Sequence, residues 1–408
     1  MEPLIPPITD IAVVGGGIVG ASIAWHLAAR NIAVTVFERG TIASGASGRT
    51  GALLRQHYSN RPEATLAHES LKVFRDWPEI VGGAPVHHPT GLVLTLAAGP
   101  HADANVARLR RNVAMQNGVG IASEAITPDR LRDLQPFVRV DDLAAAAYEP
   151  TSGYADAVAA TRGMARAAAR AGARIVEGCP VLALTAQGDR VTGVVTPSGP
   201  VRAGVVVCAA GPWSTALLGA IGVSLPVAAL RVQIAILHRP LAFDAPHFVY
   251  LDTAAGMFCR PYGPGCSLVG VSGGDQHDHV PVDPDRYEQR VDAEYPGRAI
   301  SAIARRIPGM TGAAFLNGRA GLYDMTPDAH PIIGPGPLDG LYLACGFSGA
   351  GFKKGPAVGR LMADTIVDNR CDWLDPAPFR LDRFQADGWQ RPWSENEYVF
   401  ETDFGHGF

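Results

Sequence analysis

The sequence predicts a protein of the α/β class, α+β overall, in which an antiparallel sheet is inserted into a domain built on a β-α-β unit. Residues 11–38 have the pattern of a strand, a glycine turn, a helix and a second strand. Between about residues 230 and 275 the apolar runs become longer and are broken by Pro and Gly, which is typical of antiparallel strands. The 408 residues are 47% hydrophobic and 18% charged, so the chain can form one or two hydrophobic cores.

Local patterns predict the elements of the first domain in order. Apolar runs predict strands at Ile11–Val14 and Ala33–Glu38, with a helix over Ile18–Arg30 between them. "DAVAATRGMARAAARAG", residues 156–172, predicts another helix that ends at Gly172 and precedes the strand "ARIVEG". Further strands are expected at Val181–Leu184, Val191–Thr196 and Val205–Ala209.

The inserted sheet is expected from "RVQIAILHRP", "HFVYLDT", "GMFCRPYG" and "CSLVGVSG", with the helical stretch "NVARLRRNVAMQNG" near one edge. These assignments divide the chain into two domains and a tail. We expect the first domain to comprise residues 1–85, 146–225 and 315–373, the inserted domain 86–145 and 226–314, and a C-terminal extension 374–408.

Charge and cysteine usage exclude several classes of partner. The formal net charge is -4 and neither sign runs in blocks, so we expect a small-molecule partner and no nucleic acid. The six cysteines lack C-x-x-C pairs and nearby histidines at zinc spacing, which predicts no metal site, a reducing compartment and a cytoplasmic location. A glycine cluster and His26 interrupt the apolar stretch from Ile11 to Ala29, so no membrane insertion is expected.

"VVGGGIVG" places Gly15, Gly17 and Gly20 in G-x-G-x-x-G spacing between the first strand and the first helix. The first glycine permits a tight turn, the second lets the backbone approach a pyrophosphate, and the third allows close helix–strand packing. Glu38 ends the next strand, where it can accept hydrogen bonds from a ribose diol. The context predicts a Rossmann-type dinucleotide site rather than a packing turn alone, although the motif itself does not separate NAD from FAD.

Three further stretches carry a resemblance. They are "RGTIASGASGRTGALLRQHYSN" after Glu38, "VVVCAAGPWS" at 205–214, and "GRAGLYDMTPDAHPIIG" at 318–334 followed by "GFSGAGFKKGPAVG" at 346–359. In these stretches the chain resembles the D-amino-acid oxidase superfamily, most closely its sarcosine oxidase and dimethylglycine dehydrogenase branch. The resemblance implies FAD as the cofactor, and a Rossmann-type FAD-binding domain with an antiparallel substrate-binding domain inserted in it.

The resemblance also implies which residues hold FAD. Glu38 would bind the adenosine ribose, residues 47–50 would follow the pyrophosphate and ribityl chain, Val181 would meet the adenine through its backbone, and Trp213 would pack near the cofactor. FAD is expected to be non-covalent, because Gly321, Arg49 and Ala155 stand where members of the family carry attachment residues. The full expected set is Gly15, Gly17, Ile18, Val19, Gly20, Glu38, Arg39, Ser47, Gly48, Arg49, Thr50, Val181, Ala210, Gly211, Trp213, Gly349, Ala350, Gly351, Phe352 and Lys353.

The same resemblance assigns residues to the substrate. Arg55 in "LLRQHY" and Lys353 in "GFSGAGFK" match a family pair that holds a substrate carboxylate, and a guanidinium with an ammonium group suits that task. Tyr323 is expected to position the amine or a carboxylate, while His57 and Arg260 are expected to shape specificity. The substrate class implied is an amino acid or N-alkyl amino acid, oxidised at its C–N bond to an imine.

Several alternatives stay open. Val269 aligns where sarcosine oxidases carry a lysine that helps oxygen accept electrons, so either oxygen or an unidentified acceptor is possible and a dehydrogenase role is plausible. A flavin-bearing subunit of a larger complex is the main alternative function, and the chain is expected to be a monomer, a homodimer or such a subunit. A flavin monooxygenase is less favoured, because its late Gly-Asp-Ala motif is not found.

The second glycine-rich stretch, residues 346–359, is expected to be a loop that leads into a helix. Pro356 suits the first helical turn, and the apolar spacing continues through Ile366. In this interpretation the helix N-terminus stabilises negative charge on the reduced flavin. Lys353 is expected to face the substrate, and Lys354 is expected to be exposed or to brace the loop.

Overall fold

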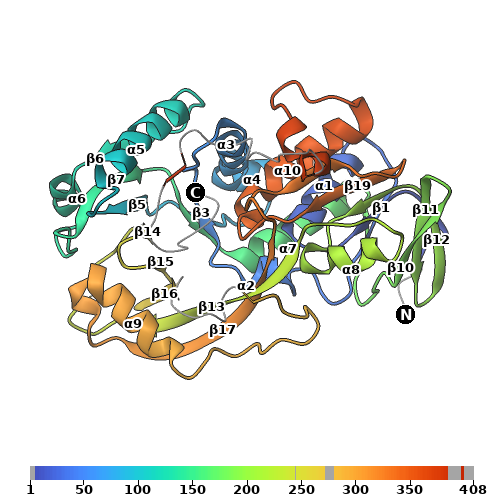
Figure 1. Cartoon of the computed structure of the whole chain (residues 1–408). Helices are drawn as coiled ribbons and strands as arrows, with labels where there is room; N and C mark the ends of the chain where they lie inside the picture. Colours follow the sequence, from blue (N-terminus) through green and yellow to red (C-terminus); the bar gives the residue numbers. More distant parts are fainter. Residues whose placement is uncertain (1–4, 244, 272–279, 385–396, 399–408) are drawn as a thin grey trace.

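The computed structural model describes residues 5–243, 245–271, 280–384 and 397–398, and it is organised around two large sheets (Figure 1). The first sheet runs in the order β10-β11-β12-β1-β2-β9, with β19 pairing β12 and β18 pairing β19. Its centre is parallel, with Val13 of β1 opposite Val36 of β2 and Val207 of β12. The bounds are β1 Ile8–Val14, β2 Val34–Phe37, β9 Arg174–Val176, β10 Ala183–Gln187, β11 Arg190–Thr196, β12 Gly199–Cys208, β18 Ile332–Pro335 and β19 Leu341–Cys345.

Helices from distant parts of the chain pack together beside this sheet. Helix α1 (Ile18–Ala28) packs against α7 (Ala157–Arg170) and α10 (Gly351–Asp368), and α10 also packs against α3 (Arg61–Arg75). Side chains of β1, β2 and these four helices form one core cluster. The β-α-β unit and the helix expected over 156–172 are confirmed, and this region also includes the short helices α2 (Ala46–Arg49), α4 (Trp77–Ile80) and α8 (Ser214–Gly219).

The second sheet runs in the order β17-β13-β16-β15-β14-β5-β7-β6 and is antiparallel except between β14 and β5, so the expected antiparallel sheet is confirmed. Helix α5 (Ala102–Asn117) lies on its β5–β7 end, α6 (Pro128–Leu134) contacts β7, and α9 (Tyr295–Arg306) packs on β13, β15 and β16. Its strands are β5 Leu92–Ala97, β6 Glu124–Ile126, β7 Leu143–Glu149, β13 Ala228–His238, β14 Val249–Asp252, β15 Met257–Pro261, β16 Cys266–Val271 and β17 Ala314–Met325.

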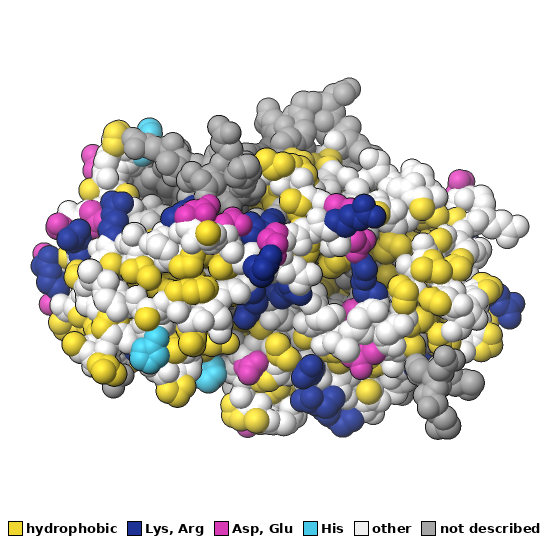
Figure 2. Space-filling model, turned by 90° about the horizontal axis from the view of Figure 1, so that it is seen from below, with side chains coloured by type: hydrophobic (Ala, Val, Ile, Leu, Met, Phe, Trp, Pro, Cys, Tyr) yellow, Lys and Arg dark blue, Asp and Glu magenta, His cyan; other side chains and the backbone are white. Residues whose placement is uncertain are grey.

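A small third sheet, β3 (Leu53–Leu54), β8 (Gly153–Ala155) and β4 (His87–His88), is also present. The division into domains remains a proposal. In this proposal the inserted domain ends with β17 rather than at residue 314, because β17 pairs with β13 along its length. In the part of the chain that the structure describes, no helix is long and apolar enough to cross a membrane. On the face shown in Figure 2, side chains of both charges are interspersed among apolar ones.

The helix expected to begin at Pro356 begins five residues earlier, at Gly351, and Pro356 lies inside it. A proline there removes one helical hydrogen bond, which normally disfavours the position. Side chains of two neighbouring helices bind the backbone beside the proline. Ser22 Oγ donates to the Pro356 carbonyl at 3.2 Å, and Ser70 Oγ accepts from the Ala357 amide at 3.0 Å. Tertiary packing therefore overrides the local signal.

Candidate cofactor and substrate site

The first glycine-rich turn brings the start of α1 against the end of β12. Gly15 has φ +110°, and a Cβ placed on it would lie 2.4 Å from the Ala209 carbonyl oxygen. A Cβ on Gly20 would lie 2.0 Å from the Gly15 carbonyl oxygen, so α1 can approach β1 only with glycine at that position. The Gly16 amide donates to Glu38 Oε2 at 2.7 Å, which fixes the carboxylate at the end of β2. The glycine turn, the N-terminus of α1 and the Glu38 carboxylate therefore lie side by side and form one continuous wall.

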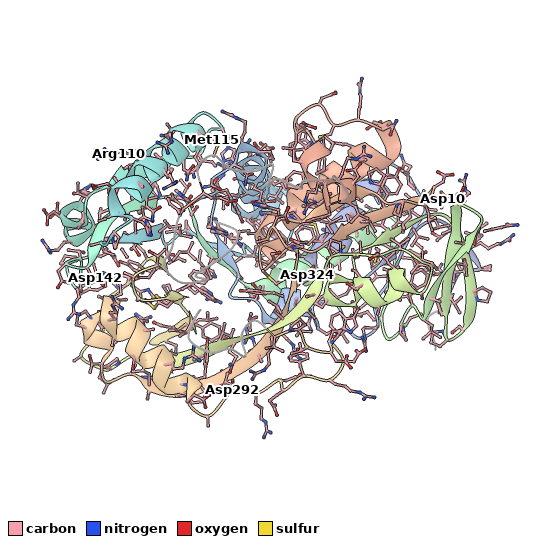
Figure 3. The ribbon with its side chains drawn as sticks, in the orientation of Figure 1. Asp10, Arg110, Met115, Asp142, Asp292 and Asp324 are labelled. Atoms are coloured by element: carbon pink, nitrogen blue, oxygen red, sulfur yellow. The ribbon has the colours of Figure 1, made fainter. Side chains whose placement is uncertain are left out.

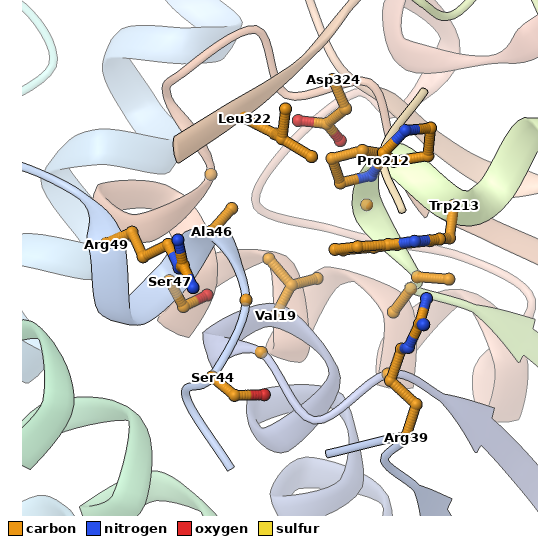
Figure 4. A pocket seen from close by; sticks show the side chains of 18 of the residues that line it. Val19, Arg39, Ser44, Ala46, Ser47, Arg49, Pro212, Trp213, Leu322 and Asp324 are labelled. Atoms are coloured by element: carbon orange, nitrogen blue, oxygen red, sulfur yellow. The ribbon is translucent and has the colours of Figure 1, made fainter. Parts of the chain in front are cut away.

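This wall borders a cavity of about 700 Å³, within the range of about 300–1,000 Å³ that is usual for cofactor sites. In Figure 4, Trp213 and Arg39 lie on one side of the cavity and Ala46, Ser47 and Arg49 on the other. Of the residues expected to bind the cofactor, those on the cavity wall are Gly15, Gly17, Ile18, Val19, Glu38, Arg39, Ser47, Arg49, Thr50, Val181, Ala210, Gly211, Trp213, Gly349, Gly351 and Phe352.

Four residues of that set do not line the cavity: Gly20, Gly48, Ala350 and Lys353. Gly20 acts through packing. Gly48 does likewise, because a Cβ there would lie 2.0 Å from the Ala43 carbonyl oxygen. Ala350 is the N-cap of α10, and Lys353 lies in its first turn. Gly20 and Gly48 therefore support the wall through packing, whereas Ala350 and Lys353 lie at the start of α10 without lining the cavity.

Residues 284–289 were not expected at this cavity, yet Pro284, Asp285, Tyr287 and Gln289 line it. Arg39 and Arg49 bind them. Arg39 Nη1 lies 2.7 Å from Asp285 Oδ1, and Arg49 donates to Gln289 Oε1 at 2.7 Å. The acidic and proline-rich sequence around Asp285 gives no local sign of this location, since the contacts span more than 230 residues.

The other end of the cavity lies where α10 begins. Gly349, Gly351 and Phe352 line it together with Tyr323 of β17, and a Cβ on Gly349 would strike the Tyr323 ring at 2.8 Å. The N-terminus of an 18-residue helix therefore opens at the cavity, where its dipole favours negative charge. This agrees with the expected arrangement, although the helix starts at Gly351 rather than Pro356.

Asp324 is a cavity residue that sequence reasoning missed. It lies where the two halves of the molecule, the one around the first sheet and the one around the second sheet, meet (Figure 3), and its carboxylate accepts a hydrogen bond from the Gly346 amide at 2.7 Å. Burial raises the pKa of Asp324 to about 6, despite backbone hydrogen bonds that favour its charged form. The available signal was an acidic residue directly after Tyr323, within the stretch at 318–334 that carries the resemblance.

Arg55, Lys353 and Tyr323 come together from three separate segments. Arg55 is buried, with 8% of its surface exposed, and Nη1 donates to the His57 carbonyl at 3.2 Å. Burial and the positive charge of Arg55 hold the pKa of Lys353 well below its usual value. Burial raises the pKa of Tyr323, and Arg55 opposes this shift. Arg55 therefore lies close enough to act electrostatically on both Lys353 and Tyr323.

Lys354 is neither exposed nor a loop residue, which corrects the expectation. It is fully buried in α10 and pairs with Glu63 of α3, which also binds His330 Nδ1 at 2.8 Å. Two cations lie near the Tyr58 ring, with Lys354 Nζ at 4.1 Å and Arg55 Cζ at 4.4 Å from its centroid. The ring of Tyr58, directly after His57 in the sequence, thus lies close to both Lys354 and Arg55.

The two remaining residues expected near the substrate lie in structural settings. His57 is fully buried, with Nε2 2.6 Å from the Tyr398 hydroxyl, and burial lowers its pKa to about 3. Arg260 donates through Nε to the Gly51 carbonyl at 2.5 Å and lies over the Tyr154 ring, and burial lowers its pKa to about 10. The His57 carbonyl therefore fixes Arg55 by a hydrogen bond, and Arg260 fixes the Gly51 backbone in the same way.

Val269 is fully buried in the core of the second half, among Tyr250, Met257 and Cys259, and it does not line the cavity. A lysine at that position would therefore not face the cofactor. The whole sequence holds three lysines, Lys72, Lys353 and Lys354. Since β16 contains no lysine, shifting the alignment with the sarcosine oxidases by one or two residues would also find no lysine there.

The fold and the site define a class of protein, a flavin- or nicotinamide-type oxidoreductase with a dinucleotide wall and two cations, Arg55 and Lys353, near it. Comparison with known proteins decides the family. The model of the DAO family, "FAD dependent oxidoreductase", matches residues 10–365, so the chain belongs to this family of FAD-dependent oxidoreductases and its cofactor is FAD. The glycine turn and the cavity fit a dinucleotide of this kind.

Named relatives agree with the family. The chain is 29% identical to the sarcosine oxidase subunit beta of Arthrobacter sp, over 92% of this chain and 91% of the relative. It is 28% identical to the glycine oxidase of Geobacillus kaustophilus, over 92% and 97%. Among solved structures it is similar to the L-proline dehydrogenase of P. horikoshii, with a TM-score of 0.84, 28% identity, and coverage of 93% and 99%.

Proposed function

We propose that the protein oxidises the C–N bond of an amino acid or N-alkyl amino acid, with Arg55 and Lys353 binding the substrate carboxylate and Tyr323 orienting its amine. The observation that carries this proposal is the cationic setting of Lys353. Burial, Arg55 and Lys354 all disfavour its charge, and the acid acting on it, Glu63, is already paired with Lys354 and His330. A substrate carboxylate would supply the missing negative charge.

FAD, when bound, supplies the hydride acceptor, so the chain's own residues mainly bind, orient and exclude water. The substrate loses a hydride from carbon and a proton from nitrogen to become an imine, which water hydrolyses to a carbonyl compound and an amine. The Arg55–Lys353 pair would fix one end of the substrate, which places its C–H bond toward the cavity wall at Tyr323. The roles of the individual cofactor-binding residues belong to the same proposal.

The decisive experiment is an anaerobic panel of N-methyl amino acids, D-amino acids, L-amino acids and L-proline. A substrate should bleach the flavin absorbance of the holoenzyme, and the matched amine without a carboxylate should bleach it far more slowly. Oxidised flavin throughout the panel would refute the proposed function, and equal rates with the uncharged amines would refute the carboxylate clamp.

We further propose that the protein works as a dehydrogenase. The support is the absence of lysine from the whole of β16, the strand in which the sarcosine oxidases are expected to carry the lysine that stabilises developing superoxide. Reduced enzyme should therefore react faster with a quinone or dye acceptor than with oxygen in stopped-flow mixing. A faster reaction with oxygen would show an oxidase.

A second candidate function is that of a flavin-bearing subunit in a larger complex. The specific observation is that the Arthrobacter relative, matched over nearly its whole length, is named as a subunit. Purification under native conditions followed by size-exclusion chromatography would test it. Full substrate turnover by the isolated chain with an artificial acceptor would argue that the chain carries out its half-reaction without a partner.

A further inference from the structure

Residues 284–289 come from the segment between β16 and α9, which belongs to the second half of the molecule, yet they lie against the cofactor cavity. Pro284, Asp285, Tyr287 and Gln289 all line it. The segment therefore reaches from the second sheet to the wall formed by the first. We call residues 284–289 the strap.

The strap is attached to one side of the cavity through Asp285. Asp285 Oδ1 accepts hydrogen bonds from Arg39 Nη1 at 2.7 Å and from Trp213 Nε1 at 2.8 Å. The Arg39 guanidinium carbon also lies 5.0 Å from the centre of the Trp213 ring. Arg39 follows Glu38 directly, so this attachment lies beside the acid at the end of β2.

The strap is attached to the opposite side through Arg49. Arg49 Nη1 lies 3.3 Å from the Tyr287 hydroxyl, and Nη2 lies 2.7 Å from Gln289 Oε1. Figure 4 shows Arg39 on one side of the cavity and Arg49 on the other. Because successive parts of the strap bind these two sides in turn, the strap crosses the cavity between them.

The two ends of the strap differ in how firmly they are held. At and just beyond its C-terminal end, Arg231 of β13 donates to the carbonyls of Glu288 and Arg290 and binds Asp292 with two nitrogens, at 2.9 and 3.1 Å. The Arg231 side chain is 14% exposed. At the other end the side chains of Arg39 and Asp285 are 51% and 52% exposed, so their ion pair is weak and sensitive to salt.

We propose that the strap closes over the end of bound FAD that lies at Glu38, and that Asp285 is the positioning residue that keeps it closed. FAD enters and leaves when the Asp285 end releases from Arg39 and Trp213, while the Arg231 end stays attached. This inference rests on FAD binding, which the family shows, and on the proposed role of Glu38, and not on the proposed substrate.

The test compares two variants of the holoenzyme that each remove one negative charge from the strap. Asp285→Asn removes the negative charge that pairs with Arg39, whereas Glu288→Gln leaves Asp285 in place, because the Glu288 carboxylate pairs locally with Arg290. FAD release is followed by the rise in flavin fluorescence after dilution, and FAD uptake by its quenching on mixing with apoprotein. We expect Asp285→Asn to speed both rates about two- to fivefold and Glu288→Gln to change neither.

Salt provides an independent readout. In the unmodified protein, release should become faster with added sodium chloride until it approaches the rate of Asp285→Asn, whose own rate should depend little on salt. Equal effects of the two variants would show a general charge effect and overturn the proposal. So would faster release with unchanged uptake, because a fixed contact to FAD, unlike a closing strap, slows only release. The anaerobic substrate panel is unaffected by either outcome, so the proposed function is tested separately.

Discussion

Lys353 and Lys354 are neighbours in the sequence, but their ammonium groups have different surroundings. Lys354 is fully buried and pairs with Glu63, so its charge is balanced within the protein. Lys353 is partly exposed, and the strongest charge acting on it is the positive charge of Arg55. One helical step of about 100° separates the two side chains and directs them to different sides of α10. One lysine therefore holds helices together and the other is available to a ligand.

Methionine at each position should separate these roles. Lys354→Met leaves Glu63 buried without its lysine partner and should lower the free energy of unfolding by roughly 3–5 kcal/mol. Lys353→Met should leave that free energy almost unchanged and raise the KM for a carboxylate substrate about 10- to 100-fold, because a charge-assisted hydrogen bond is lost. Urea denaturation and steady-state kinetics measure the two quantities. Similar effects of both substitutions would contradict the assignment.

At the scale of elements, the close approach of α1 to β1 depends on the absence of a side chain at Gly20. The backbone carbonyl that a Cβ on Gly20 would meet, at 2.0 Å, cannot move away without displacing Gly15 and the turn. The same turn binds Glu38 through the Gly16 amide. Helix packing and the shape of the cofactor wall are therefore set by the same contact.

Gly20→Ala should lower the free energy of unfolding by at least about 3 kcal/mol and weaken FAD retention, because the helix must move off the strand. Gly219→Ala in α8 is the matched control, since a Cβ there meets nothing within 4 Å. That control should change stability by less than about 1 kcal/mol, in the stabilising direction expected of alanine in a helix. Thermal melts with and without added FAD measure both. Equal melting temperatures for the two variants would rule out the steric explanation.

At the scale of the whole molecule, a buried charge network joins segments that are far apart in sequence. Glu63 of α3 binds Lys354 of α10 and His330, which precedes β18. Asp328 binds Arg383 at 2.8 Å, and Arg383 also donates to the His330 carbonyl at 2.8 Å. Burial opposes protonation of His330, but the negative charge of Glu63, together with hydrogen bonds to Glu397 and Glu63, outweighs it and raises the pKa of His330 to about 8.

This shift predicts a pH dependence of stability with a definite sign. A histidine whose pKa is raised on folding stabilises the protein fully below its unfolded pKa of about 6.5, and this contribution is lost as the pH rises through about 8. A shift of this size corresponds to about 2 kcal/mol. The difference in unfolding free energy between the unmodified protein and His330→Gln, measured from pH 6 to 9, should therefore shrink as the pH rises. A constant difference would contradict the pairing with Glu63.

Local sequence patterns determined much of this protein. The β-α-β unit, the G-x-G-x-x-G turn with Glu38, and the antiparallel strands after residue 228 follow from hydrophobic periodicity and glycine spacing, which act over a few residues. The resemblance carried by the stretches around these motifs indicated the family and FAD, and it named Arg55, Lys353 and Tyr323, which the structure brings together.

Only the tertiary structure decided the rest, because each remaining feature depends on contacts between distant residues. Pro356 lies inside a helix since Ser22 and Ser70 bind the backbone beside it. Lys354 is buried because α3 places Glu63 against it. Asp285 reaches the cofactor cavity because the second half of the molecule lies against the first, so that a segment with no local signal meets Arg39 some 246 residues away.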